Sequence, residues 1–428
     1  MMNFKSLKTG DKPFFAFALT FFSAVLLPEY FAPVMTLFCL IFSVNKKTKK
    51  ENIGYIGLSI FLLIALNVIC IVFTSSVVSS LASILLWLFM MNGYFAAIGT
   101  VNSFEKIEVI IYLGCISAGI MGLIASAEIV LFHFGKEYVG NLFNPFWHWL
   151  DLSIEKIVGI LPDAVSANFA SKTFKTFDTR ACSTLSNPLF FATIEIMLLP
   201  FTAYEFLCQN NKKRNIVGFV CLVLTCLGIA FSYSRGPYIY ALVVGVILLV
   251  YGGKKAIKLL STGVVGLGAL YILANGTFKR LLSLTNSQNI SVSTRKRVWS
   301  AVFDMIKKKP ILGYGTGFDN VRQMLHNTYK VMQPHAHNIF LEMWLENGIL
   351  GPVILAAVFI VSIIELFIVF KRNKKYYFVA ITLFASLLGV ILCGMTDCIF
   401  YGLKPLQYLM MLLGLIQATY FTAKQDIT

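Results

Sequence analysis

The sequence predicts an all-α integral membrane protein that crosses the bilayer about twelve times. Of its 428 residues, 57% are hydrophobic and only 13% are charged, and Phe alone occurs 38 times. Because soluble domains carry roughly 25% charged residues, this chain lacks the polar surface to cover a water-facing globule. The composition therefore excludes a cytosolic enzyme, a secreted disulfide scaffold and a disordered protein.

Hydrophobic segments give the number of spans. A helix needs about 20 mostly apolar residues to cross about 30 Å of hydrocarbon. The run 14–44 is too long for one helix, and Pro28, Glu29 and Pro33 interrupt it, so we divide it into two helices. Ten further predicted spans bring the total to twelve: 54–73, 78–101, 107–133, 188–208, 216–233, 238–252, 259–274, 348–370, 376–396 and 404–422.

Short basic clusters predict the orientation. They are Lys46, Lys47, Lys49 and Lys50; Lys212, Lys213 and Arg214; Lys254, Lys255 and Lys258; and Lys371, Arg372, Lys374 and Lys375. Twelve spans put all these clusters on one side together with both termini, and the positive-inside rule makes that side cytoplasmic. A signal peptide over residues 1–27 is the competing interpretation. It is disfavoured because no small-residue cleavage site follows and the apolar run continues.

We expect a single membrane domain over 1–428, with outer loops at 134–187 and 275–340. The first loop holds aromatic residues suited to the membrane interface and an amphipathic stretch at 149–160. The second holds ten basic residues on the side where they are normally depleted: Lys279, Arg280, Arg295, Lys296, Arg297, Lys307, Lys308, Lys309, Arg322 and Lys330. For the lysine triplet a solvated helix face is favoured, whereas the arginines are candidates to bind an anion.

Arg235 is the first candidate functional residue. It follows a predicted span in the string Ser-Tyr-Ser-Arg-Gly-Pro, and Gly236 and Pro237 are expected to break the helix there. An ionisable group at membrane depth indicates function, because burying it unpaired is costly. An arginine that snorkels to the interface is the alternative.

Three of the five histidines lie in the second outer loop, at His326, His335 and His337. Imidazole is the side chain suited to proton transfer near neutral pH. His335 and His337 could also bind a metal, but a site needs further ligands, and Asp304, Asp319 and Glu342 have no ligand-like spacing. We therefore predict neither a metal nor a cofactor.

Two more strings frame the histidines. Ser293 to Trp299 opens a predicted helix that runs to Lys308, and Pro310 to Gly317 is glycine-rich. No Walker lysine-serine pair accompanies those glycines, so we interpret 310–317 as a turn rather than a phosphate loop. The nine cysteines lie mostly in apolar runs without CxxC spacing, which indicates small buried residues.

Together these strings resemble the O-antigen ligase and Wzy-type polymerase superfamily of bacterial membrane glycosyltransferases. His337-Asn338, followed after nine residues by Gly348-Ile349-Leu350-Gly351, is similar to its histidine motif. Ser234-Arg235-Gly236 resembles its arginine at an outer helix end, and Arg295 with Trp299 and the glycine string resembles the entry to its large outer loop. Arg180 to Pro188 resembles the segment that opens its middle helix. The similarities span about residues 180–351.

The resemblance implies a GT-C-like enzyme that transfers a glycan from undecaprenyl pyrophosphate to an acceptor glycan or glycolipid, such as lipopolysaccharide. It implies an inverting, metal-independent reaction on the outer face of the bacterial cytoplasmic membrane. His337 would be the base, and Arg235 and Arg295 would stabilise the pyrophosphate leaving group. Arg297 and Arg180 are further candidates for that role. His335 would orient the acceptor or replace His337, and Asn338 is grouped with the substrate-binding residues.

Alternatives remain open at this stage. A Wzy-type polymerase, which extends one lipid-linked repeat chain with another, requires the same arginine and histidine chemistry as a ligase. A lipid-linked oligosaccharide flippase is less favoured, because the two halves of the chain show no internal repeat with interrupted helices. A nucleic-acid partner is disfavoured because the basic clusters are short and scattered.

Overall fold

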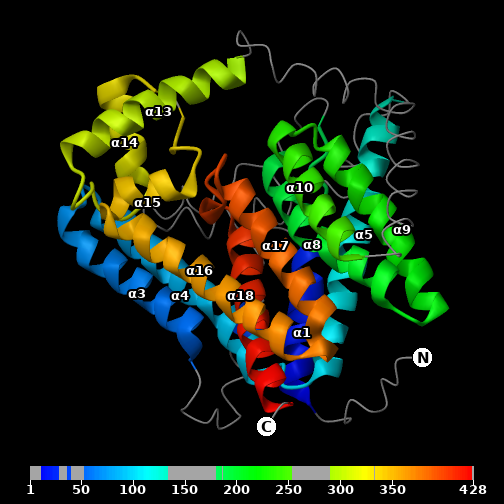
Figure 1. Ribbon diagram of the computed structural model, residues 1–428. Coiled ribbons are helices and arrows are strands. Elements are labelled where there is room, and N and C mark those ends of the chain that lie inside the picture. The colour runs from blue at the N-terminus through cyan, green and yellow to red at the C-terminus, as the bar shows by residue number, and fades with distance from the viewer. Residues whose placement is uncertain are drawn as a thin grey trace.

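The computed structural model describes residues 11–27, 36–39, 53–133, 180–185, 187–252, 290–331 and 333–426. In these residues every regular element is a helix (Figure 1). The α-helices are α1 (Lys12–Leu26), α3 (Gly54–Ile69), α4 (Val77–Thr100), α5 (Phe104–His133), α8 (Pro188–Cys208), α9 (Lys212–Phe231), α10 (Arg235–Gly252), α13 (Ile290–Lys308), α14 (Phe318–Tyr329), α15 (Ile339–Asn347), α16 (Leu350–Arg372), α17 (Tyr377–Gly394) and α18 (Leu403–Gln425). Short 3-10 turns are η1 (Cys70–Phe73), η4 (Lys374–Tyr376) and η5 (Ile399–Tyr401).

Eight helices in the described part of the chain are long and apolar enough to cross a membrane: Gly54–Phe73, Val77–Thr100, Phe104–Val130, Pro188–Cys208, Lys212–Phe231, Leu350–Arg372, Lys374–Gly394 and Leu403–Gln425. Shorter apolar helices cover Lys12–Ala24 and Arg235–Val250. The predicted polytopic all-α class is confirmed. The span 259–274, the loop 134–179 and the second half of 14–44 apart from residues 36–39 lie outside the described residues, so the total of twelve stays a prediction.

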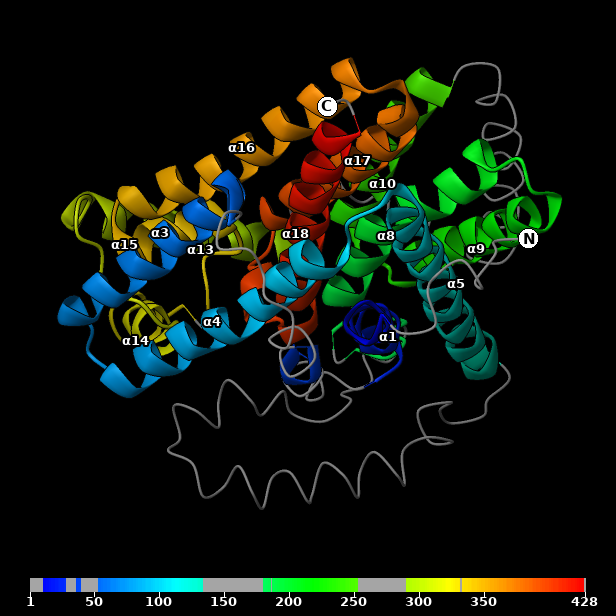
Figure 2. The ribbon, with the colours of Figure 1, turned by 90° about the horizontal axis from the view of Figure 1, so that it is seen from below.

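Helices α8 and α18 form the centre of the bundle. Nearly every side chain of α8 is buried, and so are most of those of α18, including Lys404, Gln407 and Gln417. Helix α18 packs between α4 and α16 (Figure 2), and α8 packs against α5, α9 and α17. Buried side chains on α18 form hydrogen bonds inside the bundle, as when Gln417 donates to Glu365 at 3.1 Å. Such pairing offsets the cost of burying them.

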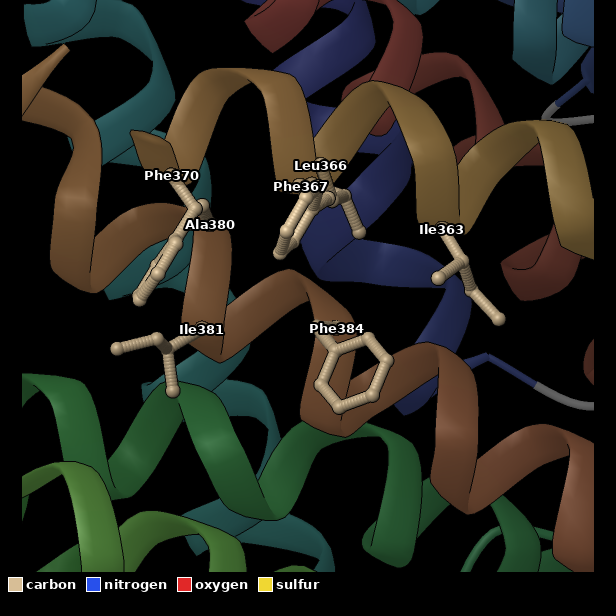
Figure 3. Close-up of a pocket in the computed structure, with 7 residues that line it drawn as sticks. All are labelled: Ile363, Leu366, Phe367, Phe370, Ala380, Ile381 and Phe384. Carbon is tan, nitrogen blue, oxygen red and sulfur yellow. The ribbon is translucent and has the colours of Figure 1, made fainter. Parts of the chain in front are cut away.

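The outer helices present apolar side chains where lipid would lie. Exposed residues of this kind on α3, α4, α10 and α16 are Leu58, Leu62, Leu81, Leu85, Leu242, Val246, Val353 and Ile360. An apolar crevice lies between α16 and α17 (Figure 3). Its lining residues are Ile363, Leu366, Phe367, Phe370, Ala380, Ile381 and Phe384. Both features are expected of helices whose outward faces are solvated by hydrocarbon rather than water.

One end of the bundle collects basic segments and the ends of the described chain. Lys106 pairs with Asp11 at 2.6 Å, Lys375 pairs with Asp426 at 3.0 Å, and the ring of Phe104 contacts that of Tyr376. These contacts place the start of α1, the start of α5, the α16–α17 turn and the end of α18 together, at the bottom of Figure 1. By the positive-inside rule we expect this end to face the cytoplasm.

A small helical unit, α13 to α15, lies at the opposite end (Figure 1). Its own apolar core joins residues of all three helices: Val298, Val302, Met305, Val321, Leu325 and Leu345. The predicted helix ending at Lys308 is confirmed, and the lysines 307–309 are exposed as expected. The predicted turn at 310–317 is also confirmed, with positive φ at Gly313, Gly315 and Gly317.

Hydrogen bonds fix this unit on α3 and α4. The Asn320 side-chain oxygen accepts from the backbone N–H groups of Ser75 and Ser76, each at 3.1 Å. The Thr316 hydroxyl donates to the Asn67 carbonyl oxygen at 3.1 Å, and the Asn347 amide donates to the Asn67 side chain at 2.8 Å. The outer unit is therefore held in one position relative to the spans.

Packing of α5 against α9 gives a test of the fold. A Cβ on Gly122 would lie 2.1 Å from the carbonyl oxygen of Leu224, so the helices would have to separate. We expect Gly122→Ala to cost about 1–3 kcal/mol of stability, as overpacking does, and to lower the thermal unfolding temperature in detergent. Gly245→Ala is the matched control, because a Cβ there meets nothing within 4 Å. Equal unfolding temperatures for the two variants would contradict the α5–α9 packing.

Candidate active site

Five segments far apart in sequence meet at the end of the bundle that carries the α13–α15 unit. They are residues 180–185, 232–240, 295–299, 335–338 and 395–401. The contacts below join each segment to the next. Four of them lie at helix ends or in the turns between helices, where side chains are not consumed by the apolar packing of the spans, and 295–299 lies within α13 of the outer unit.

The histidines lie on a turn directly before α15. Asn338 is the N-cap of α15, and its side-chain oxygen accepts from the N–H groups of Phe340 and Leu341 at 2.9 and 3.1 Å. Its amide nitrogen donates to the Met395 carbonyl oxygen at 3.0 Å. Asn338 thus fastens the turn to the 395–401 segment, which indicates that it positions the site rather than contacts substrate.

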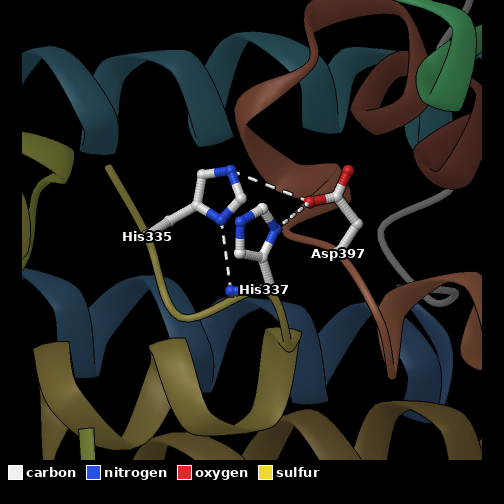
Figure 4. A group of neighbouring side chains, drawn as sticks. All are labelled: His335, His337 and Asp397. Carbon is white, nitrogen blue, oxygen red and sulfur yellow. Dashed lines mark hydrogen bonds and ion pairs between the residues drawn. The ribbon is translucent and has the colours of Figure 1, made fainter. Parts of the chain in front are cut away.

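His337 contacts a carboxylate that was not identified from the sequence. Its Nδ1 lies 3.1 Å from Oδ1 of Asp397, and Nε2 of His335 lies 3.7 Å from the same oxygen (Figure 4). Asp397 is buried, at 4% exposure, between α17 and α18. Burial alone would raise the pKa of Asp397, but the hydrogen bond with His337 and the electrostatic interaction with both histidine rings hold it below its usual value. Asp397 is therefore ionised at neutral pH.

These contacts define which ring nitrogens carry protons. A carboxylate only accepts, so Nδ1 of His337 is the donor and its Nε2 keeps the lone pair. His335 accepts at Nδ1 from the backbone N–H of His337 at 3.2 Å, which leaves its proton on Nε2, toward Asp397. Burial, with a further contribution from Arg295, lowers the pKa of His335 to about 4 despite the opposing effect of Asp397. His335 is thus a neutral neighbour, and His337 has a base at Nε2.

The three side chains also meet the distance requirement for a metal site. Ligand atoms of His335, His337 and Asp397 lie within 4.8 Å of one another. However, the lone pair of His335 Nδ1 accepts a backbone hydrogen bond, and Nδ1 of His337 donates to the carboxylate. In this arrangement the ring nitrogens that face the group are engaged in hydrogen bonds, which fits an oriented histidine–carboxylate pair.

Arg180 and the Ser-Arg-Gly string lie together. Nε of Arg180 donates to the Ser232 carbonyl oxygen at 2.9 Å, and Nη2 donates to the Ser234 hydroxyl at 2.6 Å. Glu128 accepts from the N–H groups of Cys182 and Ser183, both at 3.1 Å, and so anchors the segment that carries Arg180. The structure thus brings two predicted arginines to one place.

The helix break near Arg235 differs from the one expected. It falls at Ser232–Ser234, between α9 and α10, rather than at Gly236 and Pro237. Pro237 lies in the first turn of α10, where the missing N–H removes no helical hydrogen bond. Arg235 is consequently the first residue of α10 and is half-buried.

Helix α10 begins beside the Asp397 segment. The Tyr240 hydroxyl donates to Thr396 at 2.8 Å, and a Cβ on Gly236 would meet the same threonine oxygen at 3.3 Å. Thr396 precedes Asp397 directly. The Arg235 string and the histidine turn, which are far apart in sequence, therefore both contact the α17–α18 turn.

Of the two candidate arginines on α13, Arg295 interacts electrostatically with residues of the site. Arg295 is half-buried, and its charge acts on His335 and on Tyr240. Trp299, one turn further on, donates from its indole to the Ala336 carbonyl oxygen at 2.9 Å. Arg297 is exposed and donates to the Lys330 carbonyl oxygen at the end of α14. His326, the third histidine of the loop, is exposed on α14.

Beneath the histidine turn lies a group of buried acids on α15. Glu342 accepts from the Ala336 N–H at 2.6 Å, and the Tyr401 hydroxyl lies 2.7 Å from Glu342 and 2.5 Å from Glu346. The two glutamates are 0% and 4% exposed. Burial raises the pKa of both carboxyls. Neither glutamate is a candidate functional residue from the sequence.

Backbone strain gathers at the same place. The non-glycine residues with positive φ in the described chain are Ser183, Tyr233, Lys330 and His337. Three of these four belong to the segments that meet at the site. Each such conformation costs of the order of 1–3 kcal/mol and persists only where its surroundings enforce it.

The sequence contained one signal for Asp397. Between Glu365 and Asp426 it is the only acidic residue, and it lies where two predicted spans meet at the outer side. A lone acid between two apolar helices indicates function, because burying an ionisable group unpaired is costly.

Part of the chain is similar to a known family. Residues 220–356 match the family model Wzy_C, described as O-Antigen ligase. The match contains Arg235, Arg295 and the turn with His335 and His337, and it ends before Asp397. The resemblance predicted from these strings is confirmed.

Two curated relatives are similar over part of the chain. An uncharacterized protein of Haemophilus influenzae is 29% identical over 183 residues, which cover 37% of this chain and 45% of the relative. A ComP-specific O-oligosaccharyltransferase of Acinetobacter baylyi is 24% identical over 214 residues, which cover 47% of this chain and 38% of the relative. The chain thus spans less than half the length of the curated relatives it matches.

The protonation state of His335 can be measured directly. We expect its ring to stay neutral, with the proton on Nε2, from about pH 8 down to about pH 5, because burial holds its pKa near 4. Nitrogen-15 NMR of histidine-labelled protein in detergent would show this, with His335→Gln for assignment and exposed His326 for comparison. Titration near 6.5, the value of a free imidazole, would contradict the buried contact with Asp397.

Proposed function

Because the chain is related to the O-antigen ligase superfamily through residues 220–356, we propose that it is a glycosyltransferase that moves a glycan from undecaprenyl pyrophosphate to an acceptor hydroxyl. The observation that supports this most directly is the Asp397–His337 pair at the same end of the bundle as Arg235 and Arg295. It combines an oriented base with fixed positive charges, the two elements that such a displacement needs.

His337 would act as the base at Nε2. As the acceptor oxygen attacks C1 of the donor sugar, its proton passes to Nε2, and Asp397 stabilises the imidazolium that forms. Attack on the face opposite the leaving group inverts the anomeric carbon. His335 is neutral and lies against His337, with ring centroids 4.3 Å apart, so it would orient the acceptor.

Arg235 and Arg295 would stabilise the leaving group. When the bond from C1 to the pyrophosphate oxygen breaks, its electron pair stays on that oxygen, and fixed guanidinium groups stabilise this charge more in the transition state than in the ground state. Arg235 begins α10, whose first N–H groups favour an anion as well. Arg180, which donates to Ser232 and Ser234, would add charge beside that turn, whereas Arg297 is a weaker candidate because of its exposure.

The acceptor is supported only in general terms. The Acinetobacter relative is named as an O-oligosaccharyltransferase specific for ComP, which supports transfer of a whole oligosaccharide to a hydroxyl. We propose a cell-surface glycan or glycolipid as acceptor and the outer face of the bacterial cytoplasmic membrane as the place of reaction. The basic end of the bundle, opposite the site, supports this orientation.

Reconstitution tests the function. Purified protein in detergent, given undecaprenyl-pyrophosphate glycan and a candidate acceptor, should release lipid pyrophosphate in the presence of EDTA. His337→Ala should reduce release by about 10²–10⁴-fold, and Arg235→Ala or Arg295→Ala by about 10²–10³-fold. Arg322→Ala is the control, since that arginine is exposed on α14 beside Asp319.

The acceptor that works would separate a ligase from a Wzy-type polymerase, which uses a second lipid-linked glycan. Wild-type activity retained by His337→Ala and Arg235→Ala at normal membrane levels would remove the proposed roles. If EDTA abolished the release of lipid pyrophosphate, the proposal that the reaction needs no metal would be wrong.

Asp397→Asn tests the orientation of the base. An asparagine amide can donate to Nδ1 of His337, which moves the ring proton to Nε2 and removes the lone pair there. We expect a loss of about 10³–10⁴-fold in the transfer rate, similar to that for the aspartate of serine protease triads, with little change in folding. Asp426→Asn, which alters a paired aspartate at the opposite end, is the matched control. A loss below tenfold would show that Asp397 does not set the tautomer.

A further inference from the structure

We propose that Glu342, Glu346 and Tyr401 form a buried hydrogen-bonded cluster that holds one shared proton, and that this proton keeps the His335–His337 turn in its active position. The three residues would be positioning residues, since none contacts the reacting atoms. The inference rests on the proposed function insofar as His337 is taken to be the base.

The contacts of Tyr401 with both carboxyls require one more proton than the phenol itself supplies. The Tyr401 hydroxyl lies 2.7 Å from an oxygen of Glu342 and 2.5 Å from one of Glu346, both hydrogen-bonding distances. A phenol has one proton and can donate to only one of the two carboxyls. The second contact is attractive only if the other carboxyl is protonated and donates to the phenol oxygen. The cluster therefore carries one negative charge rather than two.

Each member of the cluster holds a different segment of the site. Glu342 accepts from the Ala336 N–H, in the middle of the histidine turn, and Glu346 accepts from the N–H of Gly317, at the end of the glycine string. Tyr401 comes from the segment that carries Asp397, and its ring lies 5.9 Å from that of His335. The cluster thus joins the outer unit, the histidine turn and the α17–α18 connection.

The surroundings favour retention of the proton. Groups that act on the cluster from neighbouring elements are Cys398 and Asp397 of the α17–α18 turn, Cys70 of η1 and His335. The thiols and the carboxyl are negative when ionised, and buried His335 is neutral. Arg295 acts on His335, whose ring lies beside that of Tyr401. Both carboxyls are buried, and two ionised carboxylates would repel each other across Tyr401.

The proposal predicts an alkaline limb in the pH profile of glycan transfer. Once the shared proton leaves, the two carboxylates separate and the turn loses its support, so the wild-type rate should fall roughly tenfold per pH unit above the apparent pKa of the pair. Glu346→Gln fixes the one-proton state, because its amide accepts from Gly317 and donates to Tyr401. That variant should change by less than about threefold between about pH 6 and about pH 9.

Matched controls separate the cluster from general effects of buried polar groups. Glu365→Gln alters a buried glutamate that pairs with Gln417 on α18, and its profile should follow the wild type. Tyr401→Phe should lower transfer throughout the range, whereas Tyr408→Phe removes an equally buried hydroxyl that donates to the Phe21 carbonyl and should not. Loss of folding in Tyr401→Phe would leave Glu346→Gln as the deciding variant.

A second measurement does not require transfer. The Trp299 indole donates to the carbonyl oxygen of Ala336, the same residue whose N–H donates to Glu342. Emission of Trp299, obtained by subtracting the spectrum of Trp299→Phe, should shift at alkaline pH in the wild type and stay constant in Glu346→Gln. If no donor supports transfer, the proposed function fails while this shift still supports the cluster. A Glu346→Gln protein that follows the wild type in emission, or in transfer where transfer is found, would overturn the proposal.

Discussion

The requirement that every backbone polar group be satisfied within hydrocarbon governs this structure. The spans must be continuous helices, and their side chains are used for packing or face lipid. Chemistry that needs charge is consequently found where helices begin and end. Arg235 starts α10, the histidine turn precedes α15, and Asp397 lies between α17 and α18. The site is assembled from helix ends, and the outer unit of α13 to α15 covers that end of the bundle.

The same constraint explains what could be predicted from the sequence. Spans such as α16 are visible as apolar runs, and α13 is visible as a basic amphipathic helix, because both depend on local composition. Arg235 and His337 stand out as polar residues next to such runs. The glycines at 313, 315 and 317 were correctly predicted to form a turn, where positive φ is needed.

Pairing between distant segments could not be predicted in this way. Asp397 lies sixty positions from His337, and no local pattern couples them. Glu342 is considered from the sequence only as a metal ligand and Glu346 has no signal there, because their partner is a tyrosine beyond an entire helix hairpin. Arg297 and Arg295 look equivalent in sequence, yet the turn of α13 between them gives one an exposed position and the other a place near His335.

The contact between His337 and Asp397 joins elements on either side of the α16–α17 hairpin. If His337 is the base, its lone pair is aimed only while that hairpin, α15 and α18 are packed together. A bundle that is partly assembled, or loosened by a missing neighbour, therefore has no oriented base. For the proposed lipid-linked donor, such a dependence would limit hydrolysis during membrane insertion, because the base becomes oriented only when the tertiary structure is complete.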